Sequence, residues 1–333
     1  MLQLNPIFAN GIVLAANKPI RIFGNGCGSV SVSFLGETVA KAVTDDWCIE
    51  LSARPCGGPY TMEISLDGKQ TRLSDVYVGE VILLSGQSNI QFKMHESKDL
   101  DAICEPCEAL RTFSLERIEK SEFYRPEDGW VVCKDADVIK NWSAIGYEVG
   151  LAVCKQKGCA VGLIACYQGA SVIQSWMPVG TADRLGIHIP TEALHIDHSN
   201  YSLWNGDGVL YETMLQRLMP YSLSHVIWYQ GESNATPAEG AVYKDMLTEM
   251  IRIWREDFDD KALPFIIVQL ANNDSRMRRH NGWILVQAAQ MKIQDAVANV
   301  KAVVCKDVCE SNDIHPPTKR YLSERIADVI NKM

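Results

Sequence analysis

The feature that most restricts the fold of this chain is a set of short apolar runs that end abruptly in small or amide residues. The runs cover residues 81–84, 160–166, 226–229 and 265–270. Continuous apolar runs of this length predict strands that are buried on both faces of a sheet. The first run leads directly into Ser85, Gly86, Gln87 and Ser88.

Amphipathic stretches lie between these predicted strands. In the clearest one, apolar residues fall at positions 243, 246, 247, 250, 251 and 254, which is the spacing of one helix face. Helices are also expected from Ser143 onward, at 283–297 and at 321–330, with further strands at 110–113 and 300–304. Strands that alternate with helices predict an α/β fold, with a parallel sheet covered by helices on both faces.

The first 75 residues have a different pattern. Residues 20–23, 30–34 and 60–66 alternate apolar with polar side chains, as half-buried strands do, and Asp67-Gly68 is a strong hairpin signal. We therefore expect two domains, a small all-β sandwich at 1–75 and an α/β domain at 76–333. The first carries no cluster of histidines, cysteines or carboxylates, which favours a structural or sugar-contacting role.

Composition limits the partners and the location. The net charge of −9 argues against nucleic acid or an anionic membrane as the main partner. No apolar run reaches the roughly 18 residues of a membrane helix, and the N-terminus lacks the pattern of a signal peptide. Eleven cysteines without a repeating framework fit a reducing compartment, so we expect a cytoplasmic protein. No feature predicts an oligomeric state.

Two groups of residues resemble metal or redox motifs. Cys104 and Cys107 form a C-x-x-C pair, but no second pair completes a zinc site and the thioredoxin-like context is missing. His195 and His198 lie in a polar stretch that is typical of a surface turn. Neither group therefore predicts a metal site.

Ser88 is the candidate nucleophile, because ligands of open α/β sheets bind just past the carboxyl ends of the strands. Gly86 lets the backbone turn there without a Cβ clash. Near the C-terminus, Asp313 and His315 are followed by two prolines and could supply a base and its orienting carboxylate. Ser88, Asp313 and His315 would form an acyl-transfer triad in that chain order.

The same segments carry a family resemblance that extends over nearly the whole chain. The chain resembles the sialate O-acetylesterases, a branch of the SGNH (GDSL-like) hydrolases, in several ordered blocks: residues 7–14, 75–81 with 85–89, 169–176, 203–206, 228–235 and 313–316. The resemblance implies a flavodoxin-like, three-layer SGNH domain after the β-domain. It also implies a serine esterase that removes acetyl groups from O-acetylated sugars and needs no cofactor.

The resemblance also implies roles for individual residues. Ser88 would attack the acetyl carbonyl and His315 would carry the proton. The N–H groups of Ser88 and Gly169 and one side-chain amide, Gln230 or else Asn234, would bind the oxyanion. The residues implied for substrate binding are Gln87, Asn89 and Glu232, although Glu232 could equally anchor its own loop.

Two departures from the family pattern leave alternatives open. Gly169-Ala170 stands where relatives often carry paired glycines, and Asn312 stands where the superfamily usually has its aspartate, three residues before the histidine. The site could therefore be a triad with Asp313 or a Ser–His dyad. The substrate could be an acetylated sialic acid, or acetylated xylan or another plant glycan. A protein that binds carbohydrate without turnover is the alternative from another class.

Overall fold

The computed structural model describes residues 2–100, 104–115, 129–187 and 203–333. Within them lies a large central sheet with the strand order β10-β9-β11-β8-β12-β13-β14. All neighbours along this path pair in parallel except the edge pair β10–β9. Its strands are β8 (Lys69–Gly86), β9 (Cys107–Ser114), β10 (Val131–Cys133), β11 (Val161–Tyr167), β12 (His225–Tyr229), β13 (Phe265–Val268) and β14 (Val300–Val303).

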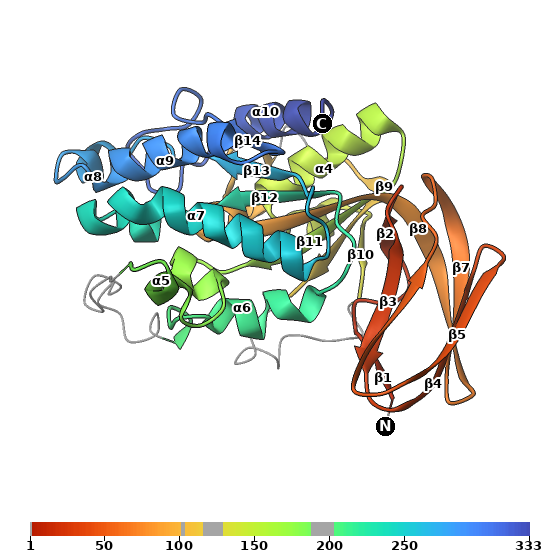
Figure 1. Cartoon of the computed structure of the whole chain (residues 1–333). Coiled ribbons are helices and arrows are strands. Elements are labelled where there is room, and N and C mark those ends of the chain that lie inside the picture. Colours follow the sequence, from red (N-terminus) through yellow and green to blue (C-terminus); the bar gives the residue numbers. More distant parts are fainter. Residues whose placement is uncertain (1, 101–103, 116–128, 188–202) are drawn as a thin grey trace.

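Helices cover both faces of this sheet (Figure 1). Leu84 and Trp228 point to opposite faces, because Leu84 is paired with Ile227 in the ladder and side chains alternate along a strand. Helix α4 packs over Leu84, and α7 packs over Trp228. Helix α10 lies beside α4, and α9 lies beside α7. The long helices are α4 (Ala144–Lys157), α7 (Pro237–Asp257), α9 (Gly282–Ala296) and α10 (Arg320–Ile330).

The predicted strands and helices of the second part of the chain are thus confirmed, as is a mixed α/β fold with a large central sheet. The apolar runs do become strands that are buried along their whole length, because helices cover both faces. In the described part of the chain, no helix has the length and apolar character needed to cross a bilayer.

The N-terminal residues form strands only: β1 (Gln3–Leu4), β2 (Val13–Ala15), β3 (Ile20–Asn25), β4 (Gly28–Phe34), β5 (Glu37–Val43), β6 (Asp46–Leu51) and β7 (Gly57–Leu66). Strands β1, β3 and β6 form a small separate sheet, and β5, β4 and β7 pair in order up to the first half of β8. The predicted Asp67-Gly68 hairpin is confirmed. Both residues have positive φ, and Leu66 pairs with Lys69 directly across the turn.

Strand β8 connects the two regions of strands. Over 18 residues it pairs first with β7, up to Val78, and then with β11, from Glu80 onward. The expected domain boundary between residues 75 and 76 therefore falls inside a continuous strand, and the division into two domains stays a prediction. Because β8 is anchored at both ends, it delivers residue 88 to a fixed point at the edge of the sheet.

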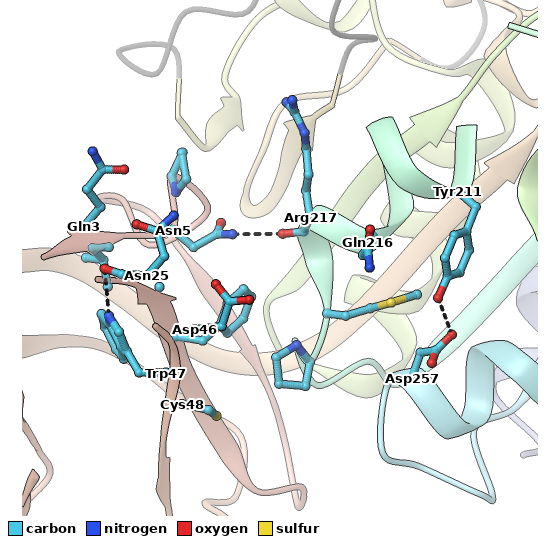
Figure 2. A pocket seen from close by; sticks show the side chains of 16 residues that line it. Gln3, Asn5, Asn25, Asp46, Trp47, Cys48, Tyr211, Gln216, Arg217 and Asp257 are labelled. Atoms are coloured by element: carbon cyan, nitrogen blue, oxygen red, sulfur yellow. Dashed lines mark hydrogen bonds between the residues drawn. The ribbon is translucent and has the colours of Figure 1, made fainter. Parts of the chain in front are cut away.

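Contacts between distant segments hold the N-terminal strands against the rest of the molecule. Tyr221 donates a hydrogen bond to the carbonyl of Val13 at 2.6 Å. Asn5 donates to the carbonyl of Arg217 at 2.8 Å, beside a cavity of about 700 Å³ at this junction (Figure 2). The junction therefore combines hydrogen bonds with apolar packing, such as that of Phe8 on Tyr221, around this cavity.

Candidate active site

Ser88 opens a short helix, α1 (Ser88–Gln91), directly after β8. Gly86 ends the strand with a φ of +130°, and a Cβ at this position would lie 2.2 Å from the carbonyl oxygen of Tyr229. Only glycine fits such a close approach of two backbones. The prediction that Gly86 permits the turn beside Ser88 is therefore confirmed.

His315 reaches Ser88 from the opposite end of the chain. Its Nε2 atom lies 2.7 Å from Ser88 Oγ, and its ring lies 6.4 Å from that of Phe92. Burial is the largest influence on the imidazole and lowers its pKa, the nearby Lys319 lowers it further, and Asp313 and Glu96 oppose this shift. A depressed pKa keeps the imidazole neutral near pH 7, in the form that can accept a proton.

Asp313 contacts the backbone of His315 rather than its ring. Its Oδ1 atom accepts a hydrogen bond from the His315 backbone N–H at 2.9 Å, and the residue is exposed. Within the described residues, no hydrogen bond joins a carboxylate to the imidazole of His315. Asp313 thus shapes the turn that presents the histidine, and the structure brings together a Ser–His pair.

Gly169 lies next to Ser88, where an oxyanion donor was expected. A Cβ on Gly169 would stand 3.7 Å from that of Ser88. Its N–H group already donates to Gln91 Oε1 at 2.7 Å. Ala170 has a φ of +55°, a conformation that glycine adopts more easily, which explains how paired glycines would suit this position.

The structure corrects the expectation that Gln230 or Asn234 is free to donate to an oxyanion. Both side chains are fully buried. Gln230 Nε2 donates to the carbonyl of Ser171 and to Asn234 Oδ1, while Asn234 Nδ2 donates to Gln174 and Glu239. A side-chain amide has only two N–H hydrogens. The N–H groups of both amides are therefore taken up by hydrogen bonds that hold the loops behind the site.

The three residues expected to bind substrate are likewise buried, and each forms hydrogen bonds with other parts of the protein. Gln87 Oε1 accepts the backbone N–H groups of Gly231 and Ser233. Asn89 Nδ2 donates to Glu232 Oε1 at 2.5 Å and to the carbonyl of Ile314 at 2.9 Å. Of the two roles expected for Glu232, these contacts fit the loop anchor. Burial raises the pKa of Glu232 to about 7.

Sequence reasoning missed Lys319, which is fully buried beneath the site. Its Nζ atom donates to Asn89 Oδ1 at 2.7 Å and lies 4.7 Å from the centre of the Phe92 ring. Burial lowers its pKa. A signal was present: residues 319, 322, 326 and 330 fall on one helical face, so the apolar stripe of α10 extends back to this lysine.

A cavity of about 190 Å³ opens beside Ser88 and His315. Its other walls are formed by Gln91, Phe92, Lys93 and Glu96. It can hold a small acyl group against the serine hydroxyl, with one ammonium and one carboxylate at its rim. His195 and His198, which resembled metal ligands in the sequence, lie outside the described residues.

Comparison with known proteins identifies a family and several proteins that are similar to this chain. Residues 78–331 match the family described as carbohydrate esterase, sialic acid-specific acetylesterase. Human sialate O-acetylesterase is 25% identical over 325 residues and the rat protein 23% over 368 residues. These matches cover 87% and 91% of this chain but only 60% and 68% of the relatives, so the chain is similar to a part of longer proteins.

A similar solved structure is that of a carbohydrate acetylesterase from Xanthomonas citri. It is 28% identical to this chain and superimposes with a TM-score of 0.83. The match covers 98% of this chain and 74% of that protein. The N-terminal strands are therefore included in the similarity, together with the α/β part.

Proposed function

Since this chain belongs to the carbohydrate esterase family of sialic acid-specific acetylesterases, which matches more than half of its length, we propose that it hydrolyses acetyl esters on sugar hydroxyl groups. The resemblance to the sialate O-acetylesterases that the sequence indicated is confirmed by this match. The reaction, its residues and its substrate are our proposal.

The observation that carries the proposal is the 2.7 Å contact between Ser88 Oγ and His315 Nε2. A serine hydroxyl is a weak nucleophile unless a base takes its proton. The imidazole is suited to this task because its lowered pKa keeps it unprotonated near neutral pH.

In the first half of the reaction, Ser88 Oγ attacks the acetyl carbonyl while His315 Nε2 accepts the hydroxyl proton. The tetrahedral intermediate then breaks its bond to the sugar oxygen, which receives that proton from His315 and departs as the free hydroxyl. The acetyl group remains as an ester on Ser88. In the second half, His315 deprotonates a water molecule that attacks this ester. The second tetrahedral intermediate then breaks its bond to Ser88 Oγ, which takes the proton back from His315 as acetate leaves.

The oxyanion of both intermediates requires N–H donors next to Ser88. We assign them to the backbone N–H groups of Ser88 and Gly169, and donors of this kind are each worth about 100- to 1000-fold in rate. Because Gly169 N–H contacts Gln91 Oε1 in the free protein, the Gln91 side chain has to release it when substrate binds. Gln91 also lines the cavity, so its amide N–H group could turn to the oxyanion instead.

The decisive experiment compares two serines of the same strand end. Ser88→Ala should abolish the release of acetate from an acetyl-ester reporter. Ser85→Ala is the matched control, because Ser85 is fully buried and its hydroxyl has no partner in the described structure. This control should keep full activity. Equal activity of Ser88→Ala and wild type would refute the proposal.

The substrate class is tested by a panel of acetylated sialic acids and acetylated xylo-oligosaccharides, with released acetate measured for each. Lys93 and Glu96 both line the cavity, so a contact between the Lys93 ammonium and the carboxylate of a sialic acid is one way in which the site could select an anionic sugar. In that case Lys93→Gln should raise KM for the sialic acid but not for the neutral oligosaccharide. Binding of these sugars without turnover would instead indicate a carbohydrate-binding protein.

A further inference from the structure

Four cysteines from separate segments line one cavity of about 340 Å³, which is not the cavity beside Ser88. They are Cys56 just before β7, Cys107 at the start of β9, Cys154 near the end of α4, and Cys159 between α4 and β11. All four are free thiols. None of them lines the cavity beside Ser88, so this cluster is separate from the proposed active site.

The packing of these segments sorts the four cysteines into two pairs. Gly150, one helical turn before Cys154, packs against Leu110 of β9, the strand that begins at Cys107. Gly57, next to Cys56, pairs with Val78 of β8, and the following Gly79 packs against Ala160, next to Cys159. In each pair one thiol is better exposed than the other: Cys56 is exposed and Cys107 half-buried, whereas Cys159 is half-buried and Cys154 buried.

The pKa values also differ within the Cys107–Cys154 pair. Hydrogen bonding with the Cys154 thiol lowers the pKa of Cys107 to about 6, which favours the thiolate near pH 7. The same bond, together with burial, raises the pKa of Cys154. Burial raises the pKa of Cys159 to about 12. This is the division between an attacking and a resolving cysteine in thiol–disulfide exchange.

We propose that this cavity is a thiol–disulfide exchange site, in which a low-molecular-weight disulfide such as oxidised glutathione converts Cys107–Cys154 and Cys56–Cys159 into two disulfides. The Cys107 thiolate attacks one sulfur of the oxidant, forms a mixed disulfide and releases one glutathione thiolate. Cys154 then loses its proton, attacks the Cys107 sulfur and releases the second. The protein loses two electrons per pair and the proton of Cys154, and the oxidant becomes two reduced glutathione molecules, one of which takes up that proton.

The surroundings of Cys107 favour this pairing over its two alternatives. Cys104 is its C-x-x-C neighbour in sequence, but Cys154 shares the cavity with Cys107 and Cys104 does not line it. Cys133 lies opposite Cys107 in the β9–β10 ladder, yet its thiol points to the carbonyl of Glu105 at 3.8 Å. A metal is not favoured, since the described residues contain no group of three or more side chains arranged to hold one.

The experiment treats the full chain with oxidised glutathione, quenches it by acid and alkylation, and maps the linkages by peptide mass spectrometry. Wild type should yield Cys107–Cys154 and Cys56–Cys159, and both should disappear after reduction with dithiothreitol. The oxidised protein should also unfold at a higher temperature than the reduced one, because both links close long loops of the unfolded chain.

Variants test the two assigned roles. Cys154→Ser should keep the Cys56–Cys159 link and trap glutathione on Cys107, and Cys159→Ser should trap it on Cys56. Cys27→Ser is the control, because Cys27 is an exposed thiol outside the cavity, and it should leave both links intact. If Cys154→Ser does not fold, Cys107→Ser tests the same pair and should leave Cys154 unmodified.

Three results would overturn the proposal: linkage of Cys107 to Cys104 or Cys133, stable glutathione adducts on wild type without either predicted link, or no modification at all. None of these outcomes bears on acetate release from Ser88, which is measured separately. The exchange site and the esterase can therefore fail independently.

Discussion

Lys319 Nζ donates a 2.7 Å hydrogen bond to Asn89 Oδ1, and through it the lysine supports both partners of the Ser–His pair. Asn89 directly follows Ser88, and its amide donates to the carbonyl of Ile314, the residue before His315. The buried Asn89 side chain, held by Lys319, thus links the segment of Ser88 to the segment of His315. The charge on Lys319 also lowers the pKa of His315.

Replacement of Lys319 by Met should therefore shift the pH dependence of the reaction. Without the positive charge the pKa of His315 rises, so the imidazole is protonated, and unable to act as a base, up to a higher pH. We expect the acidic limb of the kcat/KM profile to move to higher pH, with a larger loss at pH 6 than at pH 8. Acetate release across this range measures it.

Lys98→Met is the matched control for this change. Lys98 is exposed and pairs with Glu310 at the surface, so its loss should leave the profile where it is. If Lys319→Met lowered kcat/KM by the same factor at every pH, the lysine would act through packing alone and the electrostatic part of the argument would be wrong.

Glu232 should make the stability of the protein depend on pH. Its Oε2 atom is buried without a partner among the described residues, and burial raises its pKa from 4.5 to about 7. Between these two values the folded protein binds more protons than the unfolded chain, so the free energy of unfolding falls as the pH rises. The full effect is roughly 3 kcal/mol.

Glu232→Gln removes this titration and keeps an oxygen for the hydrogen bond from Asn89. Urea unfolding at about pH 5 and about pH 8 should therefore show a smaller loss of stability in the variant than in wild type. Glu256→Gln, at an exposed position of α7, should behave like wild type. An unchanged difference between the two pH values in Glu232→Gln would mean that this carboxyl is ionised in the folded protein.

The sequence was sufficient to predict the central sheet and the meeting of Ser88 with His315. Strands buried on both faces are apolar along most of their length, so the runs at 160–166 and 226–229 are recognisable without any structure. The carboxyl ends of parallel strands share one edge of the sheet, which limits where residue 88 can lie. The contact itself depended on the family resemblance, since no local pattern joins residues 88 and 315.

Side-chain partners could not be predicted in the same way. Gln230 and Asn234 follow a strand end, as an oxyanion donor would, but their amide hydrogens are taken by Ser171, Gln174 and Glu239. Which group an amide faces is decided by loops that arrive from distant parts of the chain. Similarly, spacing points to Cys104 as the neighbour of Cys107, while the fold brings Cys154 to the cavity that Cys107 lines.

A side chain at Gly86 should destabilise the protein for two reasons, the positive φ and a steric clash with the backbone. A substitution at Gly36 measures the first of these alone. Both residues have positive φ, but a Cβ on Gly36 meets nothing within 4 Å, whereas one on Gly86 meets a backbone oxygen at 2.2 Å. Gly36→Ala should lose only the conformational term, about 1–2 kcal/mol. Gly86→Ala should lose more than about 4 kcal/mol or fail to fold.

Circular dichroism and urea unfolding of the two purified variants measure this difference. Because the clash involves the backbone of β12, it can be relieved only by moving a central strand. A Gly86→Ala protein as stable as Gly36→Ala would mean that this end of the sheet is plastic, and that Ser88 is not held rigidly by the strand before it.

Asp313→Ala tests whether the pair acts without a third member. In a Ser-His-Asp triad the carboxylate holds the imidazole in the reactive tautomer, and its loss costs roughly 10⁴-fold in kcat. Here the Asp313 carboxylate accepts the backbone N–H of His315 at 2.9 Å, so its removal should loosen the turn and lower kcat by less than about tenfold. His315→Ala, by contrast, should lose at least about 1000-fold in kcat.

Acetate release by both variants, with unfolding curves to show that both are folded, gives the comparison. A loss near 10⁴-fold for Asp313→Ala at unchanged stability would mean that this carboxylate turns to the ring once substrate is bound, and that the site works as a triad.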